Sequence, residues 1–148
     1  MPTPYESADL VLKLYELRRE VKMREAREWF GLGFNPRTVQ DVMAALQGPQ
    51  SAYLRMVTSY WDMAAALVNH GAIDAQMFAD TNNEYLVVFA KLQPFLADLR
   101  AAFGPHYLAQ LEGVVARQPG AMERLAALRE RFRELAARRA AEPIGQTA

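Results

Sequence analysis

The chain has 148 residues, 51% of them hydrophobic and 23% charged, and its 17 basic side chains balance 17 acidic ones. This length fits a single domain spanning residues 1–148, with flexible tails expected at residues 1–6 and 142–148. The lack of cysteine excludes a disulfide scaffold, a thiol nucleophile and a cysteine-ligated metal site. A net charge of zero removes the overall electrostatic attraction that favours nucleic acid or a membrane surface, so neither partner is expected.

The sequence shows no segment that would direct the protein to secretion or into a membrane. The first residues contain neither the basic segment nor the apolar segment of a signal peptide. No run approaches the roughly 18 apolar residues of a membrane-spanning helix. The 14 arginines against 3 lysines are typical of a GC-rich coding genome. We therefore expect a bacterial cytoplasmic protein without a membrane span.

Apolar residues recur at helical spacing in the N-terminal third of the chain. Ser7 is the expected cap of a first helix over about residues 8–30. Its apolar positions are spaced alternately by four and three residues: Leu10, Leu14, Leu17 and Val21. Asn35 and Pro36 have the order of a helix cap followed by a first helical residue, which predicts a short second helix ending near Gln47.

The middle of the chain predicts two longer helices with a short turn between them. A helix over about residues 50–70 carries one broad apolar face, formed by Tyr53, Val57, Tyr60, Trp61, Ala64 and Val68. Asp74 is suited to cap a single helical turn. Thr81 and Glu84 then have the spacing of a capping box, which predicts a helix that continues to about Phe103.

Proline and glycine divide the last third. Pro94 predicts a kink or break near Leu92, because proline removes a helical hydrogen bond and clashes with the preceding turn. Two further helices are expected, over about residues 106–117 and 121–141. The sequence therefore predicts an all-α fold, a compact antiparallel bundle of about six or seven helices.

No pattern of catalytic, metal-binding or cofactor-binding residues stands out. The two histidines, His70 and His106, have no carboxylate or second histidine at ligand spacing, so we expect no metal. Gly31 and Gly33 superficially resemble a phosphate-binding loop, but the lysine and the preceding strand are missing. With no nucleophile beside a base either, we expect no catalytic residue, no cofactor and no enzyme.

One patch has the composition of a ligand pocket. Asp62 and His70 could act as titrating groups beside the aromatic rings. The candidate lining of a pocket between the third helix and the helix after Thr81 is Tyr60, Trp61, Asp62, His70 and Glu84. The alternative is that Asp62 bonds a neighbouring helix and His70 simply ends its own, since histidine in a last turn is favoured by the helix dipole.

The last helix carries the spacing of a coiled-coil seam for about two heptads. The seam residues, and hence the candidate interface, are Leu125, Leu128, Phe132 and Leu135. Arginines flank this seam, but glutamates interleave with them, which favours a solvated face rather than a nucleic-acid surface.

The segment from Tyr60 to Phe78, followed by Pro94 and Arg100, resembles a family of small helical bacterial proteins of unknown function. The shared order is an aromatic pair, an alanine-rich helix, a Gly-x-Ile-Asp turn and a short helix with phenylalanine, over about residues 50–103. The resemblance implies an all-helical fold and supplies no catalytic residues. Members often carry an N-terminal membrane helix, which we do not expect in residues 1–148.

Two functions remain open from the sequence. The first is a non-enzymatic protein–protein interaction module that forms a homodimer, because the apolar seams of the two terminal helices are narrow enough to pair across a twofold axis. The same seams could instead be fully packed inside one chain. The alternative is a small-molecule-binding or sensory domain that uses the patch around Trp61, Asp62 and His70.

Overall fold

In a computed structural model that describes residues 1–142, every regular element is helical. The α-helices are α1 (Pro4–Arg18), α2 (Val21–Glu28), α3 (Val39–Gln47), α4 (Ser51–Asn69), α5 (Ala75–Thr81), α6 (Glu84–Leu92), α7 (Leu96–Phe103), α8 (Ala109–Ala116) and α9 (Ala121–Ala141). A π-helical turn, η1 (Trp29–Gly33), follows α2, and a 3₁₀ turn, η2 (Gln93–Phe95), follows α6. The all-α prediction is confirmed, with more segments than expected. Of the expected C-terminal tail, residues 143–148 lie outside the described part.

The first helix begins earlier than predicted, inside the expected N-terminal tail. Thr3 and Glu6 form a capping box, in which the Glu6 amide donates to Thr3 Oγ1 at 3.2 Å and the Thr3 amide donates to Glu6 Oε2 at 2.9 Å. Ser7 is therefore not the cap. It is buried inside α1, where its hydroxyl oxygen accepts from the Asp74 amide at 2.9 Å and ties α1 to the start of α5.

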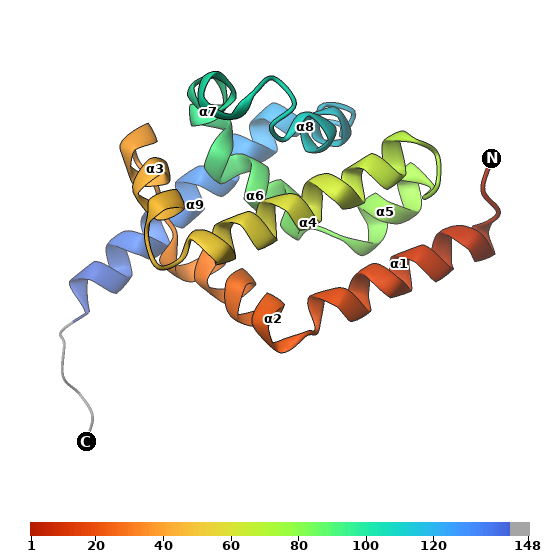
Figure 1. Ribbon diagram of the computed structural model, residues 1–148, viewed down its shortest axis with the longest axis horizontal. Coiled ribbons are helices and arrows are strands. Elements are labelled where there is room, and N and C mark those ends of the chain that lie inside the picture. Colours follow the sequence, from red (N-terminus) through yellow and green to blue (C-terminus); the bar gives the residue numbers. More distant parts are fainter. Residues whose placement is uncertain (143–148) are drawn as a thin grey trace.

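The prediction of one helix over residues 8–30 is wrong, because the helix is interrupted at Glu20. The Glu20 carboxylate accepts from the backbone amides of Lys22 at 3.0 Å and Met23 at 2.9 Å, and these bonds cap a new helix. Glutamate is not a favoured cap, so propensity gave no warning of this break. As a result α1 and α2 meet at an angle, which Figure 1 shows at the lower edge of the molecule.

Two other helices begin at different residues from those predicted, because other side chains form the local caps. The second expected helix begins at Val39, because a capping box between Thr38 and Asp41 starts it rather than Asn35 and Pro36. Thr81 does not cap α6 but ends α5, with its hydroxyl donating to the Met77 carbonyl at 2.7 Å.

Several predicted boundaries are confirmed. The Asp74 carboxylate caps α5, α4 and α9 lie within one residue of their predicted ranges, and the break at Pro94 separates α6 from α7. The helix expected over residues 106–117 starts only at Ala109, because Leu108 has a left-handed backbone conformation with a φ of 54°.

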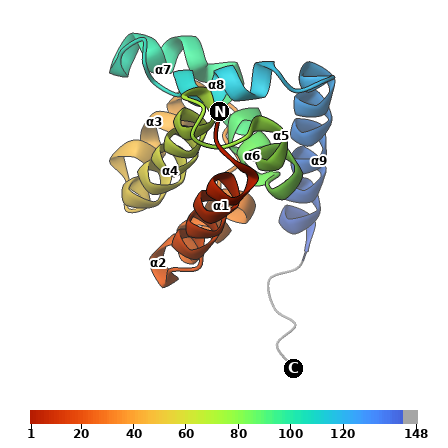
Figure 2. The ribbon, with the colours of Figure 1, turned by 90° about the vertical axis from the view of Figure 1, so that its right-hand side faces the viewer.

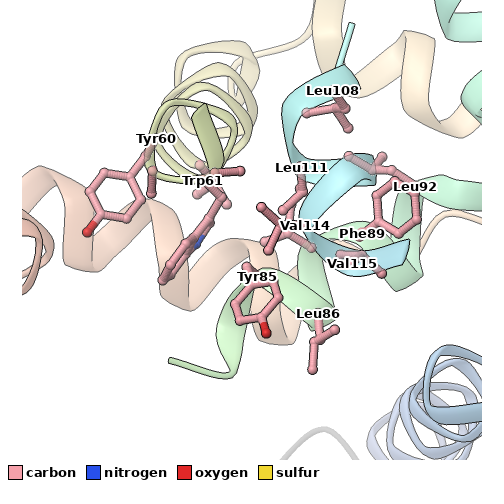
Figure 3. Close-up of a cluster of buried hydrophobic side chains, with 14 of the residues drawn as sticks. Tyr60, Trp61, Tyr85, Leu86, Phe89, Leu92, Leu108, Leu111, Val114 and Val115 are labelled. Carbon is pink, nitrogen blue, oxygen red and sulfur yellow. The ribbon is translucent and has the colours of Figure 1, made fainter. Parts of the chain in front are cut away.

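Helix α4 is the centre of the fold. It contacts α2, α3, α5, α6, α8 and η1. Its Trp61 is fully buried against the rings of Phe78 and Tyr85, with centroids 6.4 and 6.2 Å away. Figure 3 shows this cluster continuing into leucine and valine side chains of α6 and α8. The apolar face predicted for this helix thus packs into the core of the protein.

The two terminal helices lie apart. Helix α9 packs along α6, whereas α1 contacts α2 and α5. Figures 1 and 2 show α1 and α9 at different edges of the molecule, with α5 and α6 between them. Their seams therefore do not face each other within one chain.

Candidate functional site

Tyr60 and Trp61, two of the residues predicted to line a pocket, leave α4 in different directions (Figure 3). The Tyr60 hydroxyl donates to the backbone carbonyl of Leu14 at 2.5 Å, and burial raises the pKa of Tyr60 to about 12. The Trp61 ring has no exposed surface, and its face lies 5.3 Å from the guanidinium carbon of Arg18. Both side chains therefore hold α1 against α4.

Glu84 belongs to a second tie between the N-terminal helices and the core. Its carboxylate accepts from Nε and Nη2 of Arg27 at 2.9 and 2.8 Å, a two-pronged ion pair between α6 and α2. The hydrogen bond to Glu84 raises the pKa of Arg27. Arg27 also donates from Nη1 to the Arg18 carbonyl at 3.2 Å, where α1 ends. Glu84 thus fixes the bend between α1 and α2.

Asp62 and His70 lie on different parts of α4 and have separate surroundings. Asp62 Oδ1 accepts from the Leu111 amide in the first turn of α8 at 2.9 Å. Because Leu108 supplies no side-chain cap, Asp62 acts as the missing cap from another helix. His70 is exposed at the C-terminal cap of α4. The structure therefore brings Tyr60, Trp61 and Glu84 into one neighbourhood and leaves Asp62 and His70 outside it.

Replacing Asp62 with alanine tests the capping role. We expect Asp62→Ala to lower the free energy of unfolding by about 1 kcal/mol, the typical loss for a helix cap, as measured by urea denaturation. His70→Gln, on the same helix but exposed, should leave the free energy unchanged. Equal effects of the two substitutions would contradict the assignment of Asp62 as the cap of α8.

The predicted interface residues of α9 are mostly used inside the chain. Leu125 is fully buried and Leu128 packs against the core. Phe132 covers the ammonium of Lys91, with 4.4 Å between Nζ and the ring centroid. Leu135 is 39% exposed. Of the predicted seam, only its last residue therefore offers substantial apolar surface to another molecule.

The more prominent apolar surface lies on the outer face of α1. Tyr5, Leu12 and Tyr15 are 88%, 63% and 50% exposed. Tyr5 and Leu12 lie on the side of the helix opposite Leu14, which faces the core, and Tyr15 lies at the edge of that side. We call these three residues the α1 outer face. Sequence analysis missed it because the periodic pattern identifies the inward residues and treats the others as solvated.

Charges of both signs lie along α1 and just after it. Glu6, Asp9 and Glu16 are acidic, Lys13 and Arg18 are basic, and Arg19 and Glu20 follow the helix. Arg19 extends over the Tyr15 ring, with its guanidinium carbon 5.7 Å from the centroid. The C-terminal end of the strip therefore carries a guanidinium, and its N-terminal end carries the exposed ring of Tyr5.

A shallow apolar groove of about 530 Å³ adjoins the C-terminal end of α1. Leu17 of α1 lines it together with Met56, Tyr60 and Met63 of α4. Leu17 and Met63 are both exposed, but Leu17 lies on a different side of α1 from Leu12 and Tyr15, so the groove is separate from the α1 outer face. Methionines are common on surfaces that adapt to partners, because the side chain is flexible and polarisable.

None of the helices within residues 1–142 combines the length and apolar character that a membrane crossing requires. In the same range, no three acidic or histidine side chains gather closely enough to hold a metal ion.

A family model described as a domain of unknown function, DUF4760, matches residues 5–118. This range covers nearly all of α1 and the whole of α2 to α8, and α9 lies beyond it. The match confirms the predicted resemblance to a family of unknown function. Comparison with curated proteins and with solved structures gave no match.

Proposed function

The chain belongs to the DUF4760 family, whose function is unknown, and we propose that it acts as a non-enzymatic interaction domain that pairs with a second copy of itself through α1. The observation that carries this proposal is the α1 outer face, a strip of exposed apolar side chains with Arg19 at its end. The proposed role is non-enzymatic because the sequence shows no nucleophile in a recognised catalytic motif and no acid–base pair at defined spacing.

A twofold axis through Leu12 gives the pairing a definite register. In an antiparallel pair of helices related by this axis, Leu12 meets its own copy, and Tyr5 lies opposite Arg19 because both are seven residues from Leu12. Each end of the interface therefore brings a Tyr5 ring beside an Arg19 guanidinium of the partner, a cation–π pair, whereas a parallel arrangement would place like residues together.

The test is the effect of a charge at the centre of the strip. We expect Leu12→Glu to raise the dimer dissociation constant at least tenfold, because two buried leucines are replaced by two facing carboxylates. Light scattering after size-exclusion chromatography, over a series of protein concentrations, measures the constant. Circular dichroism should show unchanged helical content, since Leu12 contributes little to the chain's own core.

Met122→Glu is the matched control. Met122 is 60% exposed, close to the 63% of Leu12, but lies at the start of α9. It should leave the dissociation constant unchanged. A wild-type chain that stays monomeric at all concentrations, or equal weakening by the two substitutions, would overturn the proposal.

A further inference from the structure

A cavity of about 390 Å³ lies against the middle of α9, and α1 contributes no residue to its lining. Its walls come from the end of α6 with η2, from the segment after η1 and from α9. This volume is at the lower end of the range of about 300–1,000 Å³ that is typical of small-molecule sites. The cavity contains no residue of the α1 outer face, so a ligand site here can be tested separately from the proposed dimer.

The cavity is lined by cations and apolar groups. Arg37, Lys91, Arg129 and Arg133 border it, and its lining contains no carboxylate. The rest of the lining is mainly apolar, with Phe95 and Phe132 as the largest side chains. A site with several positive charges and aromatic walls favours an organic anion with an apolar body over a neutral or cationic molecule.

Lys91 supplies a buried positive charge rather than a direct contact. It is 6% exposed, and its ammonium donates to the backbone carbonyls of Phe30, Gly31 and Phe34 at 2.7, 3.0 and 2.8 Å. Within the described residues no carboxylate forms an ion pair with it. Its charge is therefore balanced only by dipoles and by the Phe132 ring, and it contributes a positive potential to the cavity.

Arg129 supplies the directed donors. Its Nη1 donates to the Ala90 carbonyl at 3.3 Å and to Gln93 Oε1 at 2.9 Å, which fixes the guanidinium at the cavity wall. Within residues 1–142 these bonds engage Nη1 alone, which leaves Nε and Nη2 as donors. Burial and the neighbouring charge of Arg133 lower the pKa of Arg129, as expected for a cation without an acidic partner. Arg133 itself is paired with the exposed Glu130 at 3.1 Å.

We propose that this cavity binds a small carboxylate with an apolar body, whose head group accepts from Arg129 and whose hydrocarbon packs between Phe95 and Phe132. Four of the ten lining residues come from α9, which lies beyond the range matched by the family model. The site is therefore a property of this chain with its last helix, and the matched domain alone does not form it.

Calorimetric titration with decanoate tests the proposal, with decanamide and decylammonium as ligands of equal length and different charge. We expect decanoate to bind at least tenfold more tightly than decanamide, because a charge-assisted bond replaces a neutral one. Decylammonium should bind more weakly still. Decanoate that binds no more tightly than decanamide, or that shows no saturable binding, would overturn the proposal.

Substitutions on α9 locate the site. Arg129→Gln should weaken decanoate binding about tenfold, the loss expected for one charge-assisted hydrogen bond. Arg131→Gln makes the same change on the exposed side of α9 and should have no effect. Equal weakening by both would mean that decanoate responds only to the overall charge of α9, and this would overturn the assignment of the cavity.

A second pair of variants fills the space without removing a charge. Ala136 lines the cavity, whereas Ala137 is exposed beside it. Ala136→Phe should weaken decanoate binding at least tenfold by occupying the site, and Ala137→Phe should leave binding unchanged. Retained binding by Ala136→Phe would place the ligand elsewhere and overturn the proposal. These variants keep it testable even if Arg129→Gln loosens α9.

Discussion

Replacement of Lys91 by methionine is expected to lower the free energy of unfolding by about 3 kcal/mol. The ammonium of Lys91 is the donor for three backbone carbonyls where the π-helical turn η1 ends, and two of these bonds are fully buried. Each buried carbonyl left without a donor costs about 1–3 kcal/mol. Methionine keeps the length and the apolar body of the lysine, so the loss reports the hydrogen bonds, offset in part by the relief of a buried charge, and not a cavity.

Lys13 provides the matched control for this substitution. It is exposed on α1, and its one ion pair within residues 1–142 is with Asp9, at 2.9 Å. Lys13→Met should change the unfolding free energy by less than about 1 kcal/mol, as is usual for surface ion pairs. Urea denaturation at one fixed protein concentration, well below the dimer dissociation constant, measures both variants. If Lys91→Met is no more damaging than Lys13→Met, the ammonium does not hold η1.

The stability of the wild-type protein is expected to rise between pH 7.5 and 9.5 by about 2 kcal/mol relative to the Lys91→Met variant. Burial lowers the pKa of Lys91 from 10.5 to about 8. Below pH 8 both the folded and the unfolded chain carry the proton, and this group gives no pH dependence. Between about pH 8 and 10.5 the unfolded chain binds the proton more strongly, so raising the pH stabilises the folded state.

The choice of pH range separates Lys91 from the tyrosines. Burial raises the pKa of Tyr60 to about 12, which makes the folded state lose stability as the pH rises above about 10. Measurements that end at pH 9.5 avoid this opposite effect. The readout is the difference between wild type and Lys91→Met in urea denaturation at each pH. A difference that stays constant, or that shrinks as the pH rises, would contradict the lowered pKa of Lys91.

The class of fold and several boundaries could be predicted from local sequence. Asp74 precedes a single turn and caps it, and Pro94 breaks a helix at the predicted place. Both effects depend on interactions within a few residues, which a sequence displays directly. The break at Glu20 could not be predicted in this way, because it depends on a carboxylate that is a poor cap by propensity and on the tie between Arg27 and the end of α1.

The candidate sites were harder to predict than the fold. The aromatic and acidic residues around Trp61 have the composition of a pocket, but the structure uses Tyr60 and Glu84 to hold the N-terminal helices in place. The cavity beneath α9 draws its residues from three distant segments, so no spacing in the sequence reveals it. The sequence did not indicate that Lys91 is buried either, because a single lysine in an apolar helix usually lies on the side of the helix that faces solvent.

The capping of α8 by Asp62 also constrains the order in which the chain folds. Helix α8 has 8 residues, and an isolated helix shorter than about 12–15 residues is marginal in water. Its first turn is satisfied by a carboxylate 49 positions earlier in the chain. We therefore expect the segment after Leu108 to gain a stable helical conformation as it docks on α4, and not as an early, autonomous helix.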